Sequence, residues 1–244
     1  MILAAGLGTR LMPFTAEVPK ALIGLNGIPL LALAIGKLRQ SGFNEIIVNI
    51  HHHAQKVRDF LNQRDFKEIH IAISDESEGL LDTGGGILKA RWFLDGSDPF
   101  VVFNVDVITS LDLNKLYHEH MNKRALVTLA VSQRESGRYF LFDRDDNLCG
   151  WKNARDGKTR WSGNPDPNSR PLAFSGIHVI SPEIFSLITE TGRFSIVDMY
   201  LRLAQAHQIK AYDHSGQVWF DLGKPDQIAV VSKYLEDHPE LITL

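Results

Sequence analysis

The chain has 244 residues, 44% of them hydrophobic, so it can bury one full α/β core and is short for two. Its formal net charge of −3, without long basic runs, argues against nucleic acid or an anionic membrane surface as a partner. The single cysteine, Cys149, cannot form an internal disulfide. Because the start of the chain also lacks a secretory leader pattern, we expect a reducing, cytoplasmic setting.

Apolar runs alternate with amphipathic stretches through the first half of the chain. This pattern predicts strands over Glu45–Ile50, Ile69–Ser74 and Phe100–Asn104, and helices over Leu30–Ser41, Ala54–Asn62 and Thr83–Leu94. Strands and helices in this order form βαβ units, so we expect an α/β fold with a mostly parallel central sheet flanked by helices. The carboxyl ends of such strands share one edge, where ligands bind.

The pattern changes after Ala125. Turns such as residues 143–147 separate shorter apolar runs, which predicts an antiparallel or mixed portion with strands over Leu126–Val131, Tyr139–Phe142, Leu148–Lys152 and Leu172–Ile180. Residues Asn153 to Arg170 are polar and contain two prolines and two glycines, which is typical of a mobile flap. A last helix is expected over Pro225–Asp237, with its proline in the first turn.

The first strand runs into a glycine turn, Leu3-Ala4-Ala5-Gly6-Leu7-Gly8-Thr9-Arg10-Leu11-Met12-Pro13, and Pro19-Lys20 follows. Small residues let backbone N–H groups approach phosphates closely, and Arg10 and Lys20 add positive charge. A dinucleotide-binding G-x-G-x-x-G would need glycine at Leu11, and the Gly-Lys of a Walker motif is absent. The alternative without a ligand is a plain glycine turn after a strand.

The turn, read as G-x-G-T-R-L-x-P followed by P-K, resembles the signature of the sugar-1-phosphate nucleotidyltransferases. Further pieces follow in the family's order, so the resemblance covers Met1 to about Leu235: Leu81–Gly86, Asn104-Val105-Asp106, Phe174–Ile177 and Trp219–Gly223. It implies a single-domain Rossmann-like nucleotidyltransferase fold over 1–244, with a small antiparallel sugar-side portion. Residues 1–124 would mainly bind nucleotide and 125–244 mainly sugar. Family members usually begin a few residues earlier, and whether residues precede Met1 stays open.

The resemblance implies a reaction between two phosphates. An oxygen of a sugar 1-phosphate attacks the α-phosphorus of a nucleoside triphosphate in line, and pyrophosphate leaves. The attacking phosphate is already largely dianionic at pH 7, so no Ser-His or Cys-His base is required. Asp106 and Asp221 each follow an apolar segment and resemble the family's Mg²⁺-binding aspartates; for either alone, a turn or cap role is the alternative. Arg10 would hold the leaving pyrophosphate, and Lys20 would lie near the α-phosphoryl group or the sugar phosphate.

The remaining site residues fall into a nucleotide group and a sugar group. The nucleotide group consists of Leu3, Ala4, Ala5, Gly6, Gly8, Thr9, Asp82, Thr83 and Gly84. The sugar group consists of Phe174, Ser175, Gly176 and, more weakly, Lys152. Three glycines at a helix start disfavour the helix, so we expect a base or ribose to approach closely there, although Asp82 or Thr83 can also serve as an N-cap.

Three departures from the family's common pattern affect substrate choice and the metal motifs. A glycine usually stands at Asp82, and the L-x-T-G-G-G form found here resembles the N-acetylmuramate-1-phosphate uridylyltransferase branch. Val105 replaces a glycine before Asp106, and Lys224 follows Gly223 where threonine is common; neither change removes a carboxylate. The base and the sugar stay open, with N-acetylmuramate, mannose (as in the mannose-1-phosphate guanylyltransferases) and glucose as alternatives.

Two other functions remain possible at this point. A phosphocholine cytidylyltransferase shares the opening signature, and an acidic and aromatic choline site would distinguish it. A catalytically silent nucleotide-sugar sensor is a second alternative, against which the intact Arg10, Lys20, Asp106 and Asp221 argue. The run His51-His52-His53 is interpreted as structural, because no second His or Cys cluster has metal-ligand spacing.

Overall fold

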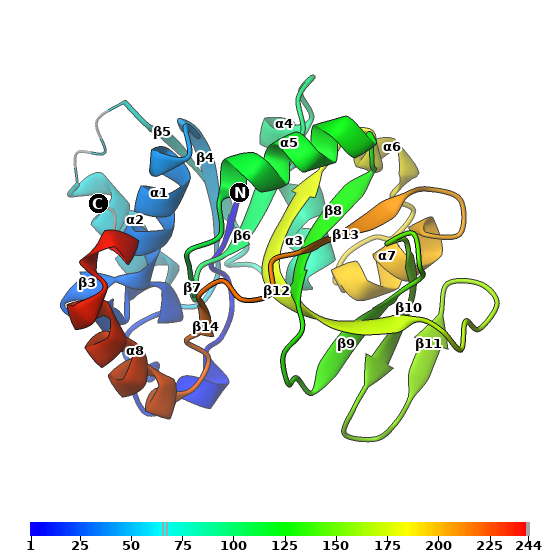
Figure 1. The fold of residues 1–244 in the computed structure, drawn as a ribbon. Coiled ribbons are helices and arrows are strands. Elements are labelled where there is room, and N and C mark those ends of the chain that lie inside the picture. Colours follow the sequence, from blue (N-terminus) through cyan, green and yellow to red (C-terminus); the bar gives the residue numbers. More distant parts are fainter. Residues whose placement is uncertain (65, 67, 243–244) are drawn as a thin grey trace. The chain divides into compact units, whose positions relative to one another are not determined.

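The computed structural model describes residues 1–64, 66 and 68–242. Within them the chain forms two compact units, labelled by their elements in Figure 1. The first unit comprises Met1–Leu81, Phe103–Leu111 and Val218–Leu244. The second comprises Asp82–Val102 and Asp112–Gln217. No helix in the described part of the chain has the length and apolar character that a membrane crossing requires.

The first unit alternates strands and helices along the chain, as Figure 1 shows. Its strands are β1 (Ile2–Leu3), β2 (Gly24–Leu25), β3 (Ile28–Pro29), β4 (Glu45–Ile50), β5 (His70–Asp75), the end of β6 (Phe100–Asn104), β7 (Val107–Thr109) and β14 (Trp219–Asp221). Its helices are α1 (Leu30–Gln40), α2 (Ala54–Asn62) and α8 (Pro225–Asp237), with 3₁₀ turns η1 (Thr9–Leu11), η2 (Lys20–Leu22) and η3 (Pro239–Leu241).

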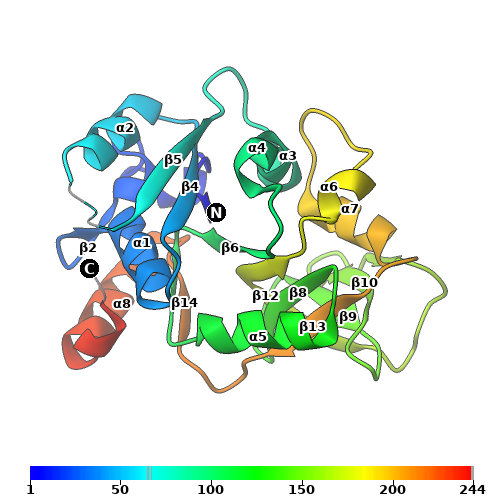
Figure 2. The same ribbon diagram turned by 90° about the horizontal axis from the view of Figure 1, so that it is seen from above.

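A parallel sheet with strand order β6-β1-β4-β5 forms the core of the first unit. Strand β4 is buried at every position after Glu45, as expected for a parallel strand covered on both faces. Helix α1 is buried over most of its surface, including Leu30, Leu31 and Ile35. Figure 2 shows α1 and α2 running alongside β4 and β5. The carboxyl ends of β1 and β6 therefore lie side by side at one edge.

A short antiparallel pair, β7 with β14, extends this edge of the first unit. Its register places Asp221 opposite Val107, and the Leu222 N–H donates to the Asp106 carbonyl oxygen at 2.9 Å. The β7–β14 ladder thus joins segments that are more than a hundred residues apart in the sequence. Helix α8 follows directly, with Pro225 in its first turn as expected.

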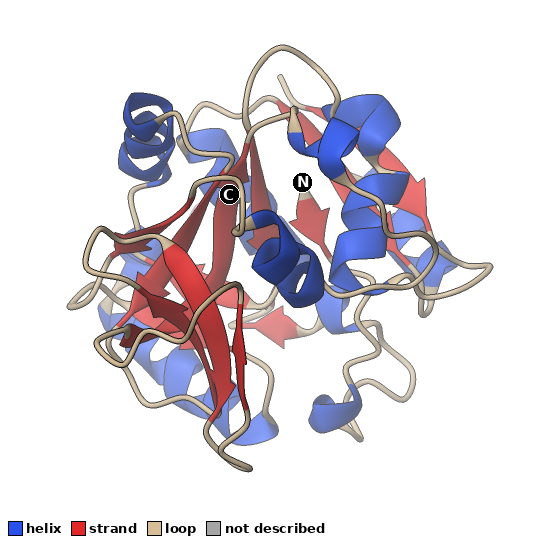
Figure 3. Ribbon diagram, turned by 90° about the vertical axis from the view of Figure 1, so that its right-hand side faces the viewer, coloured by secondary structure: helices blue, strands red, loops and turns tan. Residues whose placement is uncertain are grey.

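The second unit combines a mixed sheet with helices, which Figure 3 distinguishes by colour. Its strands are β8 (Val127–Ser132), β9 (Arg138–Phe142), β10 (Leu148–Asn153), β11 (Thr159–Trp161), β12 (Arg170–Ile180), β13 (Ile209–Asp213) and the start of β6. Its helices are α3 (Asp82–Lys89), α4 (Arg91–Leu94), α5 (Leu113–Lys123), α6 (Ile184–Leu187) and α7 (Ile196–Leu203). The pairs β11–β10, β10–β9, β9–β12 and β12–β8 are antiparallel, and β13 pairs parallel with β8.

The structure confirms the predicted α/β class, with a mainly parallel sheet flanked by helices and an additional antiparallel portion. One detail of the prediction is wrong. The helix expected over Thr83–Leu94 breaks at Ala90 into α3 and α4, where Ala90 has a φ of −82° and a ψ of 3° and its N–H is shared between the carbonyls of Gly86 and Ile87. The segment expected to be a mobile flap contains a short strand, β11, which pairs with β10, and its mobility stays a prediction. The assignment of 1–124 to nucleotide and 125–244 to sugar stays a prediction.

Candidate active site

The glycine turn begins where β1 ends, at Leu3. Gly8 adopts a φ of 64°, and a Cβ there would come within 2.7 Å of Thr15 Cγ2, so this position requires glycine. The turn is closed by the Leu11 N–H and the Thr15 hydroxyl, which both donate to the Gly8 carbonyl oxygen at 2.8 and 2.9 Å. This closure fixes η1, which carries Arg10, at the edge of the sheet.

Backbone donors in this turn fall into two sets. The N–H groups of Ala4 and Ala5 donate to Asn49 Oδ1, at 2.6 and 3.3 Å. Within residues 1–64, 66 and 68–242, no hydrogen bond runs from the N–H groups of Gly6, Leu7 or Gly8 to another residue. The space that a Cβ on Gly6 would take is empty. An open turn with unused amides is a concavity suited to an anion, so Gly6–Gly8, rather than Ala4 and Ala5, has donors to offer a phosphate.

The carboxylates of Asp106 and Asp221 lie close together in the first unit. Asp106 sits between β6 and β7 and is buried, and its carboxylate forms an ion pair with the Lys20 ammonium. Burial alone would raise the pKa of Asp106, but the charge and hydrogen bond of Lys20 hold this pKa below its ordinary value. Burial, and next the neighbouring Asp106 carboxylate, raise the pKa of Asp221. The pair therefore resists carrying two negative charges without a further cation.

Arg10 reaches the same place from the glycine turn. A Cβ on Gly223 would come within 2.7 Å of Arg10 Nη2 and 2.8 Å of Asp221 Oδ1, so the guanidinium and the carboxylate both border this glycine. Gly223 is buried, and any side chain at this position would displace one of the two. The structure thus brings together Arg10, Lys20, Asp106 and Asp221.

The carboxylate pair fits a divalent metal ion. Asp221 Oδ1 is buried and has no hydrogen-bond partner among the described residues. No group of three or more His, Cys, Asp or Glu side chains in that part of the chain could hold a metal. Two carboxylates, one with an unused buried oxygen, match Mg²⁺, which commonly takes one or two carboxylates and completes its shell with water and substrate phosphates.

The expected base-reading segment opens α3 in the second unit. Asp82 adopts a φ of 61°, a conformation that asparagine and aspartate tolerate better than most residues and glycine adopts freely. Its Oδ1 accepts a hydrogen bond from the adjacent Thr83 N–H at 2.7 Å. The Thr83 hydroxyl accepts one from the Ile196 N–H at 3.1 Å. Neither side chain is therefore a conventional N-cap of this helix.

Gly84 has a structural neighbour that the sequence did not suggest. A Cβ at this position would lie 2.4 Å from Cε2 of Phe194, and the Phe194 carbonyl oxygen accepts from the N–H groups of Gly84 and Gly85 at 3.0 and 3.3 Å. The close approach expected at this glycine is therefore made by Phe194. Direct contact of Gly84 with a nucleotide stays a prediction.

The predicted sugar group lies on β12 and β10. The Ser175 hydroxyl is fully buried and contacts His214 Nε2 at 2.7 Å. Gly176 has a φ of 74° at a register shift of β12, which is a typical use of glycine in a bulge. The Phe174 carbonyl oxygen accepts from Arg134 at 2.7 Å, and Lys152 is exposed on β10. Contacts of these residues with a sugar stay predictions.

Three positions that border this site or its glycine turn received no role at the sequence level: Gly223, Asn49 and Glu76. The glycine of Asp221-Leu222-Gly223 was a visible signal, whereas nothing local marks Asn49 or Glu76. Two residues of the histidine run contact backbone carbonyl oxygens, His51 Nδ1 that of Glu76 at 2.7 Å and His53 Nε2 that of Ala16 at 3.1 Å, and the structural interpretation of the run stays a prediction.

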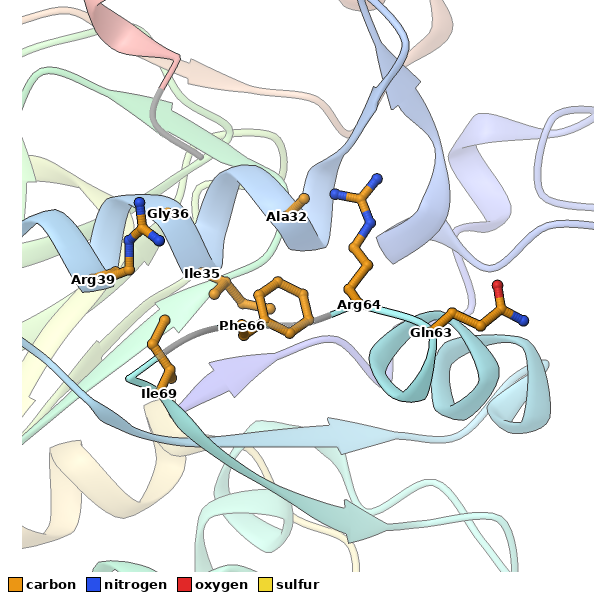
Figure 4. A pocket seen from close by; sticks show the side chains of 8 residues that line it. All are labelled: Ala32, Ile35, Gly36, Arg39, Gln63, Arg64, Phe66 and Ile69. Atoms are coloured by element: carbon orange, nitrogen blue, oxygen red, sulfur yellow. The ribbon is translucent and has the colours of Figure 1, made fainter.

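A cavity of about 430 Å³ elsewhere in the first unit is lined by none of the predicted site residues. Figure 4 shows Phe66 and Ile69 facing α1, with Arg39 and Arg64 at its margins.

Sequence comparison places the chain in a family. A profile described as nucleotidyl transferase matches residues 1–238. The chain belongs to the nucleotidyltransferase family. It is 30% identical over 237 residues to an N-acetylmuramate α-1-phosphate uridylyltransferase of Neisseria meningitidis, covering 91% of this chain and 92% of that protein. A protein of the same description from Caulobacter vibrioides is also 30% identical, over 233 residues, with 92% and 91% covered.

Solved structures share the fold. HddC from Yersinia pseudotuberculosis, in a crystal structure complexed with GMP-PN, has a TM-score of 0.77 and 21% identity, covering 96% of this chain and 97% of that one. Together with the relatives, the family match confirms the resemblance to sugar-1-phosphate nucleotidyltransferases drawn from the glycine turn.

Proposed function

We propose that this nucleotidyltransferase transfers a nucleotidyl group from a nucleoside triphosphate to a sugar 1-phosphate, and that UTP and N-acetylmuramate α-1-phosphate are its substrates. The observation that carries the reaction class is the cluster of Arg10, Lys20, Asp106 and Asp221 beside a turn with unused amides. The substrate pair is supported by the two relatives that match nearly all of this chain, and by the L-x-T-G-G-G form at Asp82.

In this proposal the residues work by positioning and by neutralising charge. A non-bridging oxygen of the sugar phosphate forms a bond to the α-phosphorus, and the bond from that phosphorus to the β-phosphate oxygen breaks, releasing pyrophosphate. Arg10 suits the leaving pyrophosphate, because a guanidinium can donate two parallel hydrogen bonds to phosphate oxygens. Lys20, a compact charge already held by Asp106, suits the α-phosphoryl group or the incoming phosphate.

Asp106 and Asp221 would hold Mg²⁺. When bound, the ion would supply positive charge that offsets the repulsion between the two anionic substrates. The buried, unpartnered Oδ1 of Asp221 and the raised pKa of this carboxyl group support the assignment, since a cation would stabilise the doubly ionised pair. The lone cysteine supports the cytoplasmic setting, which stays a prediction.

A pyrophosphate-release assay tests the proposal. Four nucleoside triphosphates are combined with N-acetylmuramate α-1-phosphate, mannose 1-phosphate, glucose 1-phosphate and phosphocholine, each with Mg²⁺ and with EDTA. We expect the highest kcat/KM for UTP with N-acetylmuramate α-1-phosphate, and loss of turnover in EDTA. Activity with CTP and phosphocholine alone would favour the choline alternative. Binding of triphosphate without turnover in any combination would favour a silent sensor, and either result contradicts the proposal.

A further inference from the structure

Glu76 is a fully buried carboxylate that the reaction does not use. It follows β5 in the first unit and has a relative exposure of 0%. Its Oε1 accepts from Asn49 Nδ2 at 2.7 Å, and its Oε2 accepts from the Leu81 N–H at 3.0 Å. A buried carboxylate is costly unless donors satisfy it, so its presence indicates that these particular bonds matter.

Asn49 connects this carboxylate to the glycine turn. It lies on β4, opposite Leu3 in the parallel register of β1 with β4. Strand β1 ends at Leu3, so the next two amides have no strand partner on this side. Asn49 Oδ1 accepts from both of them, Ala4 N–H at 2.6 Å and Ala5 N–H at 3.3 Å. The side chain thus continues the ladder by one step after the strand has ended.

The direction of the hydrogen bonds restricts which side-chain types can stand together at positions 49 and 76. The backbone N–H groups of Ala4 and Ala5 stand at one end of this series of hydrogen bonds, and that of Leu81 stands at the other. Because these groups can only donate, each end needs an acceptor. Between these donors, the side-chain amide of Asn49 accepts with its oxygen and donates with its nitrogen. The group that faces this nitrogen must therefore be an acceptor. Asparagine at position 49 and glutamate at position 76, which accepts at both oxygens, meet this requirement.

We propose that Asn49 and Glu76 form a positioning pair for triphosphate binding. By holding Ala4 and Ala5, the pair fixes the backbone that leads into Gly6–Gly8, whose amides are left for phosphate oxygens. This inference rests on the proposed function, because it assigns the turn to the triphosphate. Neither side chain hydrogen-bonds to the Asp106–Asp221 cluster among the described residues, so the pair acts on triphosphate affinity and leaves the chemical step to that cluster.

Two single substitutions and their combination test the pair. In Glu76→Gln, an amide faces two donors and can accept from only one of them. In Asn49→Asp, two carboxylates face each other. In the double variant Asn49→Asp/Glu76→Gln, the amide introduced at position 76 donates to the carboxylate introduced at position 49 and accepts from the Leu81 N–H, so every group is satisfied with the donor and acceptor exchanged. Asp75→Asn, at the residue before Glu76 and in a partly exposed ion pair with Arg58, is the matched control.

We expect each single variant to raise KM for the triphosphate on the order of tenfold, with kcat within a few-fold of wild type. The double variant should return KM to within about threefold, and the control should leave it unchanged. Singles with unaltered KM, or a double variant that does not recover, would overturn the proposal. The single variants could instead melt at a lower temperature, and the double variant at the wild-type temperature, while KM stays constant in all of them. That result would show that the pair only stabilises the fold, and it would also overturn the proposal.

Amide hydrogen exchange and nucleotide binding give readouts that do not depend on turnover. Exchange at Ala4 and Ala5 should accelerate in both single variants and slow again in the double variant. Calorimetric titration with UTP, and separately with GTP, should follow the same order. If the wild-type protein releases no pyrophosphate with any substrate pair, the proposed reaction fails, while exchange and titration still decide the role of the pair. Unchanged exchange at both alanines would overturn the pair even if the reaction is confirmed.

Discussion

The two units bury polar groups of different kinds. Among the described residues, both buried carboxylates, Glu76 and Asp106, belong to the first unit, and the three buried histidines belong to the second. The histidines are held neutral, since burial lowers the pKa of His120 to about 4. Charge concentrated in one unit points to ligand chemistry, whereas neutral buried rings contribute to packing. Substitutions of the buried carboxylates in the first unit should therefore cost more activity than stability, and those of the buried histidines in the second should do the reverse.

The largest expected effect is at the carboxylate pair. Asp221→Asn should lower kcat on the order of 10²- to 10³-fold. Its melting temperature should be unchanged or higher, because a pKa raised in the folded state means that folding disfavours the ionised carboxylate at neutral pH. Asp106→Asn should lose similar activity but also stability, since it leaves the Lys20 ammonium without its ion pair. Steady-state kinetics and thermal unfolding measure both; turnover within a few-fold of wild type with unaltered Mg²⁺ dependence would contradict the assignment.

The next largest effect concerns the hydrogen-bond geometry of the cationic side chain at position 10. Arg10→Lys keeps the charge but removes bidentate donation, and we expect kcat to fall on the order of 10²-fold with little change in stability. Arg58→Lys, in a partly exposed ion pair of the same unit, is the matched control and should behave as wild type. Full kcat in Arg10→Lys would exclude bidentate recognition of the pyrophosphate.

In the second unit, Gly84→Ala should act mainly on stability. The added Cβ meets the Phe194 ring at 2.4 Å, and overpacking of this kind costs about 2 kcal/mol of unfolding free energy. Gly96→Ala, in the same unit with open space around the Cβ position, is the control. Combining Gly84→Ala with Phe194→Leu should recover part of the loss. Urea unfolding measures these differences, and equal stability of the two alanine variants would contradict the packing account.

Acid should weaken the second unit through His120. Above the ordinary histidine pKa of 6.5, His120 is neutral in both states and its contribution is complete. Between pH 6.5 and about 4 the unfolded chain binds a proton that the folded chain does not, so stability falls as pH falls. We expect about 2 kcal/mol between pH 7 and pH 5 from this group. In urea unfolding, His120→Gln should lose less unfolding free energy between pH 7 and pH 5 than the wild-type protein does. An equal loss in both proteins would contradict the role given to His120.

Local sequence signals predicted the parts of the site that follow strands. Arg10, Lys20 and Asp106 stand next to a glycine turn or an apolar run, and a family signature was available for each. Asn49 and Glu76 escaped, because their function depends on a parallel register and on hydrogen bonds across 27 residues or more, which no local pattern encodes. Helix α5 was also missed, although Asp112 caps it by accepting from Asn114 and Lys115. The partner of Gly84 was invisible because Phe194 is more than a hundred residues away.

The smallest expected effect separates the two possible roles of Asp82. The left-handed backbone at this position accounts for the glycine common in the family, so Asp82→Gly should leave unfolding free energy within about 0.5 kcal/mol of wild type, while Asp82→Ala should lose about 1 kcal/mol. Asparagine tolerates this conformation as well as aspartate does. Asp82→Asn therefore isolates the chemistry of the side chain from the geometry of the backbone.

One carboxylate oxygen of Asp82 is engaged with Thr83, and the other is the one expected to accept from the base. We expect Asp82→Asn to lower kcat/KM for UTP a few-fold and to change the ranking of the four triphosphates, because an amide can also donate. Measuring kcat/KM for all four with the Asn and Gly variants decides the question. A uniform change across the bases would show that the residue shapes the turn without reading the nucleotide. Base choice would then have to come from other residues.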